Sequence, residues 1–263
     1  MQVFIDGEYS PNFIMQYGLP QGSVIGPLGF IFYTHAVGYI LRHHGIKYHL
    51  YADDIQMYII VDSTIPGDVA CALFRLSQCV KDIQNWMATN KLKLNQDKTE
   101  FFIASSPYHM QRLQHHTLLL EDAEIYPASS IRNLGVIFDQ HMTMSEHVTQ
   151  LCRSINWQIR NIYRFRRFID FETCHRIVRS LVMSKLDYCN VLLNGLAKKD
   201  LKRLKSCKTS VLDLFVKYPD PNTLHQALTD FIGSQSQIAS STKLFSMFLN
   251  PSMGSLHFTL TRA

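Results

Sequence analysis

The sequence predicts an α+β fold, in which an antiparallel sheet with helices on one face is followed by a helical region. In the first half of the chain, short runs of β-branched and aromatic residues alternate with turn residues, as in paired strands. Between residues 66 and 90, and again from about residue 143, apolar residues recur at spacings of three and four, which is typical of amphipathic helices. The 263 residues, 46% of them hydrophobic, suffice to bury a sizeable core.

The chain begins with a predicted pair of short strands over residues 3–10. Asp6 and Gly7 mark the bend between them, because this dipeptide favours tight two-residue turns. Residues 13–17 predict a further short strand.

A loop rich in glycine and proline follows at residues 18–27, and its backbone is suited to close approach to a ligand. Pro27 fits the first turn of a helix that we expect to run to about His43. Residues 24–41 carry no charge over a length that could span a bilayer. The glycines and the proline in this stretch make a poor membrane helix, so we expect a buried helix.

Two adjacent carboxylates stand between two apolar runs, at residues 46–50 and 55–61. The segment Tyr51-Ala52-Asp53-Asp54 therefore predicts a hairpin with an aspartate pair at its tip. Mg²⁺ binds carboxylate oxygens and holds substrate phosphates, and two such ions can clamp the attacking and leaving oxygens of a phosphoryl transfer. The competing interpretation, a solvated aspartate turn, is the commoner structure for an isolated pair.

A long helix is predicted from Pro66 to about Asn90, and we assign its apolar stripe to the core rather than to function. Further strands are predicted at residues 98–103, 118–120 and 131–138. The residues of the stripe are Val69, Leu73, Leu76, Val80, Ile83 and Met87.

From about Thr143 the pattern is helical, with a second helix at residues 171–186. Basic residues outnumber acidic ones strongly from Leu151 to Lys208, although the net charge of the whole chain is only +5. This block indicates either a surface for a polyanion or a solvated helix face. The apolar face of the first helix consists of Val148, Leu151, Ile155, Ile159 and Ile162.

The six cysteines show no Cys-x-x-Cys spacing, so a zinc site is not expected. We expect these cysteines to be small buried residues of a protein in a reducing compartment. No signal peptide or transmembrane segment stands out, and we therefore expect an intracellular protein of the cytoplasm or nucleus.

Four motifs follow one another along the chain. They are Gly18-Leu19-Pro20-Gln21-Gly22-Ser23-Val24-Ile25-Gly26-Pro27, Tyr51-Ala52-Asp53-Asp54, Trp86-Met87 with Leu92-Lys93-Leu94-Asn95-Gln96-Asp97-Lys98-Thr99-Glu100, and Asn133-Leu134-Gly135-Val136. In this order, they resemble the reverse transcriptase of non-LTR (LINE-type) retrotransposons, a class of transposable element. The resemblance covers roughly residues 3–205.

The resemblance implies an RNA-directed DNA polymerase, a nucleotidyltransferase that uses two Mg²⁺ ions, an RNA template with a DNA primer, and deoxynucleoside triphosphates. It implies that Asp53 and Asp54 are catalytic and bind the metal, and that the role of Asp54 is the smaller one. Tyr51 and Ala52 would then lie close to the primer 3′ end and the incoming nucleotide.

The resemblance also implies roles for the other motifs. Pro20, Gln21 and Gly22 would pack against the template–nucleotide pair, with Ser23 opening the next helix, and Lys98 would approach the nucleotide phosphates. Leu134, Gly135 and Val136 would form the primer grip, and the basic helices after it would be a thumb that follows the duplex backbone.

The chain departs from the family in two ways, and the first suggests a truncated enzyme. In this interpretation, residues 1–142 are part of the palm and residues 143–205 are the thumb. The fingers and the first catalytic aspartate motif have no counterpart, and Asp6 is better explained as a turn residue. We therefore expect weak Mg²⁺ binding and no polymerisation by this chain alone. A non-catalytic nucleic-acid-binding remnant or pseudogene product is the alternative, and no membrane or specific protein partner is predicted.

The second departure is the tail, residues 206–263, where serine, threonine, asparagine and proline increase and the helical pattern fails. The codons for the chain from Cys207 on can also be read in a shifted frame, which joins the third base of each codon to the first two bases of the next. In that frame they can encode amino-acid sequences similar to those that follow the thumb in the family. We therefore expect a reading-frame shift near Ser206 and a tail without a selected fold, with a genuine polar tail as the open alternative.

Overall fold

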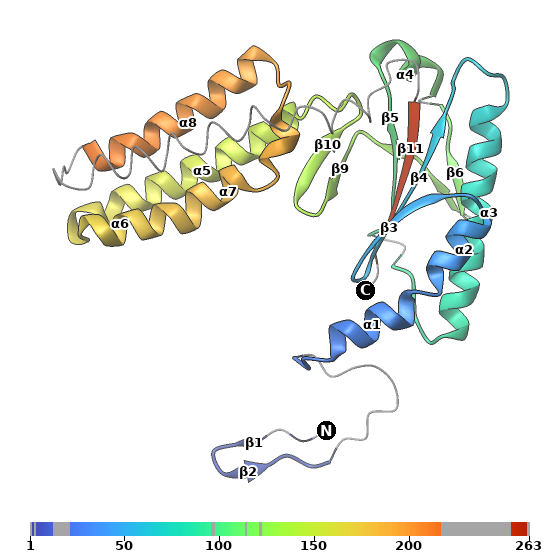
Figure 1. Cartoon of the computed structure of the whole chain (residues 1–263), viewed down its shortest axis with the longest axis horizontal. Helices are drawn as coiled ribbons and strands as arrows, with labels where there is room; N and C mark the ends of the chain where they lie inside the picture. Colours follow the sequence, from blue (N-terminus) through green and yellow to red (C-terminus); the bar gives the residue numbers. More distant parts are fainter. Residues whose placement is uncertain are drawn as a thin grey trace. The chain divides into compact units, whose positions relative to one another are not determined.

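The computed structural model confirms the α+β fold and divides the chain into two compact units (Figure 1). Unit 1 comprises Met1–Ile103, Leu113–Pro127 and Ser255–Ala263, and unit 2 comprises Ala104–Arg112 and Ala128–Gly254. The structure describes residues 2, 4–12, 22–95, 98–113, 115–120, 123–216 and 254–261.

A five-stranded sheet forms the centre of unit 1, with the strand order β3-β4-β11-β5-β8 (Figure 1). The predicted hairpin is present, because β3 and β4 are antiparallel neighbours. Consecutive buried side chains on β5, Phe101 and Phe102, show that both faces of this strand are covered. The strands are β3 (Lys47–Tyr51), β4 (Asp54–Val61), β5 (Glu100–Ala104), β8 (Pro127–Ala128) and β11 (Gly254–Thr261).

The helix α3 (Asp68–Thr89) packs against β4 and against β6 (Leu118–Leu120), which pairs with β7 (Ala123–Ile125). Every residue of the predicted apolar stripe on this helix is buried, so its assignment to the core is confirmed. The short helix α4 (Pro107–Leu113) follows β5 in the chain.

The single helix expected up to His43 is divided into α1 (Gly26–Thr34) and α2 (Val37–His43). The Thr34 hydroxyl donates to the carbonyl oxygens of Phe30, at 2.9 Å, and Ile31, at 3.4 Å. Such back-bonding by a threonine competes with the helical ladder and bends helices, which accounts for the break after Thr34.

The expected burial of this stretch is wrong for α1. Phe32 in this helix is 79% exposed, and Val24, which precedes the helix, is 92% exposed. By contrast, α2 buries Val37 and Leu41 as it packs against α3 and β3. No described helix is long and apolar enough to cross a membrane.

The first strand pair, β1 (Phe4–Ile5) and β2 (Glu8–Tyr9), is joined by Asp6 and Gly7 as predicted. Both connecting residues have positive φ, +50° and +88°, as a type I′ turn requires. The strand predicted at residues 13–17 lies outside the described residues.

Unit 2 combines a hairpin with a group of helices. The side chain of Val136, in the hairpin of β9 and β10, belongs to the same buried cluster as side chains of α5 and α8. The hairpin therefore packs with the helices of unit 2, rather than with the region that the sequence predicts to end at residue 142. The predicted apolar face of α5 is confirmed. The elements are β9 (Ser130–Asn133), β10 (Val136–Asp139), α5 (Ser145–Phe165), η2 (Arg166–Phe168), α6 (Phe171–Val178), η3 (Arg179–Met183), α7 (Ser184–Asp187), η4 (Asn190–Leu193) and α8 (Lys198–Val216).

The helix predicted at residues 171–186 is continuous in the chain but contains a π-helical segment, η3, between α6 and α7. The hydroxyl of Ser180, in this segment, donates to the carbonyl oxygen of Arg176 in α6 at 2.9 Å. π-Helical turns inside α-helices are frequent at functional sites.

Helix α8 continues ten residues past the boundary expected at Ser206. Cys207, Val211 and Leu214 are buried in the core of unit 2, and Arg166 Nε donates to the Leu214 carbonyl oxygen at 3.2 Å. Residues 206–216 are therefore helical rather than part of an unfolded tail. The expectation for residues 217–253 falls outside the described part of the chain.

Candidate active site and nucleic-acid interface

The aspartate hairpin closes with a two-residue connection. Tyr51 pairs with Asp54 across the ladder, so that only Ala52 and Asp53 link β3 to β4. Ala52 has a φ of +51°, a left-handed conformation that costs a residue with a Cβ about 1–2 kcal/mol. Backbone strain of this kind clusters at functional sites, because the surrounding structure must hold it in place.

The two carboxylates occupy different environments. Asp53 is exposed in the turn, whereas Asp54 is half-buried as the first residue of β4. Because side chains alternate along a strand, Asp54 shares a face with Gln56, opposite the buried side chain of Ile55.

Burial raises the pKa of the Asp54 carboxyl above its ordinary value, and the neighbouring charge of Asp53 raises it further. The positive charge of Lys98 acts in the opposite direction on the pKa of the same group. Folding thus brings Lys98 within electrostatic reach of the Asp54 carboxyl.

This raised pKa makes the stability of the protein depend on pH. Because folded Asp54 keeps its proton to higher pH than unfolded Asp54, the stabilisation from its protonated form is lost as pH rises from roughly 4 through the folded pKa. Asp54→Asn should therefore raise the melting temperature at pH 7, and the gain should disappear below about pH 4. Thermal denaturation of both proteins between pH 3.5 and 7 checks this, and an equal shift at every pH would contradict it.

The carboxylates of Asp53 and Asp54 are hard oxygen ligands of the kind that Mg²⁺ prefers. Across the described residues, no three His, Cys, Asp or Glu side chains gather where one ion could be held. The pair therefore fits part of a magnesium coordination shell, with the remaining ligands to be supplied by water, substrate or other groups.

The glycine-rich loop is described from Gly22, which has a φ of +88°. Ser23 Oγ accepts a hydrogen bond from the backbone N–H of Gly26 at 3.2 Å, so this side chain opens α1 as expected. Pro20 and Gln21 lie outside the described residues. Tyr51, next to the turn of the aspartate hairpin, is 62% exposed.

The β9–β10 hairpin turns at Leu134 and Gly135, which both have positive φ, +45° and +84°. These values are those of a type I′ turn, and they are unusual for a leucine. The Tyr188 hydroxyl donates to the Leu134 carbonyl oxygen at 2.6 Å and so fastens the turn to the end of α7, while Val136 is buried beneath it. No sequence signal indicated this role for Tyr188.

One face of α5 combines positive charge with an aromatic ring. The exposed residues Arg153, Trp157, Arg160 and Arg164 recur at spacings of three and four, so they share one side of the helix. We call them the α5 arginine face. Other basic residues have structural roles, since Arg166 is buried against backbone carbonyl oxygens and Arg203 donates to Thr149 and Asp200.

A family model described as reverse transcriptase (RNA-dependent DNA polymerase) matches residues 3–138, more than half of the chain. The chain belongs to this family. No curated protein and no solved structure matches the chain. The match includes the aspartate hairpin and the turn at Leu134 and Gly135, and it ends just before α5.

Membership of the reverse transcriptase family makes this chain a polymerase-like domain, and a nucleic-acid template and nucleotides are the substrates of that activity. The strained aspartate hairpin of unit 1 is therefore the candidate active site. The α5 arginine face, which lies beyond the matched residues, is the candidate interface for a nucleic-acid backbone.

Proposed function

We propose that the chain is a fragment of an RNA-directed DNA polymerase of non-LTR (LINE-type) retrotransposon origin. Unit 1 carries part of the palm, and the helices of unit 2 form the thumb. The observation that supports this proposal most is the two-residue turn that holds Asp53 and Asp54 together, with the charge of Lys98 acting on the Asp54 carboxyl.

Asp53 and Asp54 hold Mg²⁺ in this proposal, and the ion supplies neutralisation of the phosphate charge that develops during nucleotidyl transfer. Lys98 adds positive charge beside the nucleotide phosphates, and the exposed ring of Tyr51 borders the primer end. The two-ion reaction belongs to the complete enzyme, because one pair of neighbouring carboxylates positions two ions poorly.

On the nucleic-acid side, the turn at Leu134 and Gly135 acts as the primer grip, and the α5 arginine face contacts phosphates of a primed RNA template. Phosphate contacts by arginine are independent of sequence, and an exposed tryptophan adds a surface for stacking or sugar contacts. The chain alone therefore binds primed template without extending it.

A non-catalytic nucleic-acid-binding remnant is the second candidate. The α5 arginine face favours it, because this surface is formed by one helix of unit 2 and needs no metal. Both candidates share duplex binding, and they differ in whether the aspartate hairpin still binds a divalent ion.

Metal binding at the hairpin can be measured with Mn²⁺, a paramagnetic substitute for Mg²⁺. We expect weak binding in the millimolar range that broadens the NMR signals of residues 51–55, and we expect Mg²⁺ to reverse it. The double variant Asp53→Asn, Asp54→Asn should lose the broadening, whereas Asp6→Asn, in another turn, should keep it. Broadening that survives the double variant would show that the ion binds elsewhere and would contradict the proposal.

A further inference from the structure

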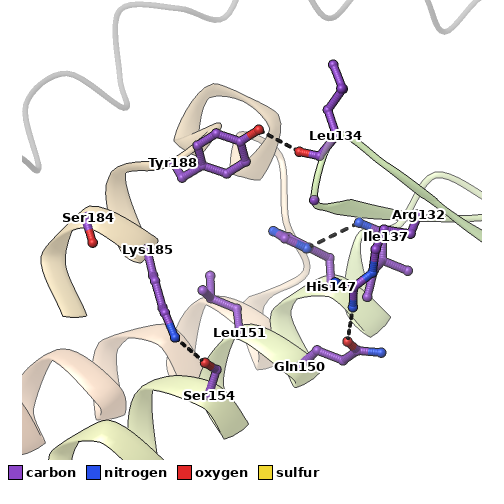
Figure 2. Close-up of a pocket in the computed structure, with 11 residues that line it drawn as sticks. Arg132, Leu134, Ile137, His147, Gln150, Leu151, Ser154, Ser184, Lys185 and Tyr188 are labelled. Atoms are coloured by element: carbon purple, nitrogen blue, oxygen red, sulfur yellow. Dashed lines mark hydrogen bonds between the residues drawn. The ribbon is translucent and has the colours of Figure 1, made fainter. Parts of the chain in front are cut away.

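A cavity of about 660 Å³ opens in unit 2 between the β9–β10 hairpin and the helices α5 and α7 (Figure 2). Its lining residues all belong to this unit, so the cavity is independent of the aspartate hairpin. Among the residues that the structure describes, Arg132, His147 and Lys185 line the cavity, and no acidic side chain does.

His147 is only 9% exposed, and its Nδ1 atom accepts a hydrogen bond from the Ile137 backbone N–H at 3.4 Å. The ring proton therefore resides on Nε2, and Figure 2 shows this second nitrogen turned toward the open space of the cavity. Burial and the nearby charge of Arg132 lower the pKa of His147, so the ring is a neutral N–H donor at physiological pH.

The two positively charged side chains of the cavity donate hydrogen bonds to uncharged side chains. Lys185 Nζ donates to Ser154 Oγ at 2.7 Å, and Arg132 Nη2 donates to Gln150 Oε1 at 3.0 Å (Figure 2). Lys185 is the second residue of α7, which begins where the π-helical segment ends, and such segments are frequent at functional sites. Two positive charges and one buried donor thus line the cavity, and its described lining contains no acid to neutralise them.

The remaining lining is apolar. Leu134, Ile137 and Leu151 form part of it, and the hydroxyl of Tyr188 is already bound to the Leu134 carbonyl oxygen. A volume of this size is within the range of small-molecule sites, which combine apolar walls with a few placed polar groups. A bare phosphate would leave the apolar walls uncovered, whereas a nucleotide has both an anionic and an apolar part.

We propose that this cavity binds the phosphate of a single nucleotide, with Lys185, Arg132 and His147 Nε2–H around the phosphate and the nucleoside against the apolar wall. The nucleotide comes either free or as the phosphorylated end of a strand. This site is separate from the metal-dependent chemistry proposed for Asp53 and Asp54, and it does not depend on that proposal.

Isothermal titration of the full chain with deoxyadenosine 5′-monophosphate tests the site. We expect saturable binding that is at least tenfold weaker in Lys185→Met and in Arg132→Met. Lys199→Met, which removes one charge from an exposed position on α8, is the matched control and should bind as the unmodified chain does. Deoxyadenosine, which lacks the phosphate, should give no binding, and inorganic phosphate should compete.

A second titration distinguishes the two sources, with a short single-stranded oligonucleotide carrying a 5′-phosphate and the same strand without it. Binding of the monophosphate supports a free nucleotide, and binding of the phosphorylated strand alone supports a strand end. Binding of neither probe, or equal affinity in the two cavity variants and the control, would overturn the proposal. Circular dichroism confirms folding of each variant, and Arg132 is exposed, so its replacement leaves the core intact.

Discussion

Replacing Arg153, Arg160 and Arg164 by glutamine should weaken binding of the chain to a primed RNA–DNA duplex on the order of 100-fold at low salt. Each arginine that contacts a phosphate releases about one counterion, so the slope of log K against log salt should fall by about three. Electrophoretic mobility shift or fluorescence anisotropy across a salt series measures both quantities.

A matched triple variant separates the α5 arginine face from general positive charge. Lys199, Lys202 and Lys205 are exposed on α8, and their replacement by glutamine removes the same charge. We expect this variant to keep most of its duplex affinity. An equal loss in both triple variants would contradict the assignment of the interface to α5.

Replacing Asp200 by alanine should lower the free energy of unfolding by about 2–3 kcal/mol, because two hydrogen bonds of a buried carboxylate are lost together. Asp200 is fully buried in the first turn of α8, where Ser145 Oγ donates to it at 2.6 Å and Arg203 Nη1 lies 3.4 Å from it. It therefore joins the start of α5 to the start of α8.

Urea denaturation measures this loss, with Glu172→Ala as the control. Glu172 forms an exposed ion pair with Arg176 on α6, and such pairs contribute about 0–1 kcal/mol. A loss for Asp200→Ala no larger than that of the control would show that the buried network does not hold the two helices together.

The local structure near the aspartates was predictable because it depends on short-range chemistry. The residues 46–61 alternate around a turn-forming pair, and Asp6 with Gly7 requires positive φ, so both hairpins followed from the sequence. The break after Thr34 was not predictable from the apolar pattern. It depends on whether the Thr34 hydroxyl donates its hydrogen bond to solvent or to a carbonyl oxygen of its own helix.

The long-range features of the candidate sites escaped prediction for a related reason. Tyr188 binds the Leu134 carbonyl oxygen, and Lys185 binds Ser154, across separations along the chain that no local pattern encodes. Helix α8 also extends to Val216 because Arg166 and the core of unit 2 stabilise its last turns, although its polar composition suggested an earlier end.

The central proposal is that the Asp53–Asp54 hairpin is one part of a polymerase metal site and is insufficient alone. A primer-extension assay tests it most directly, with a primed RNA template, deoxynucleoside triphosphates and Mg²⁺, and with duplex binding recorded in the same reaction. We expect salt-dependent duplex binding and no extension beyond that of the Asp53→Ala variant. Mg²⁺-dependent incorporation by the unmodified chain that Asp53→Ala abolishes would contradict the proposal.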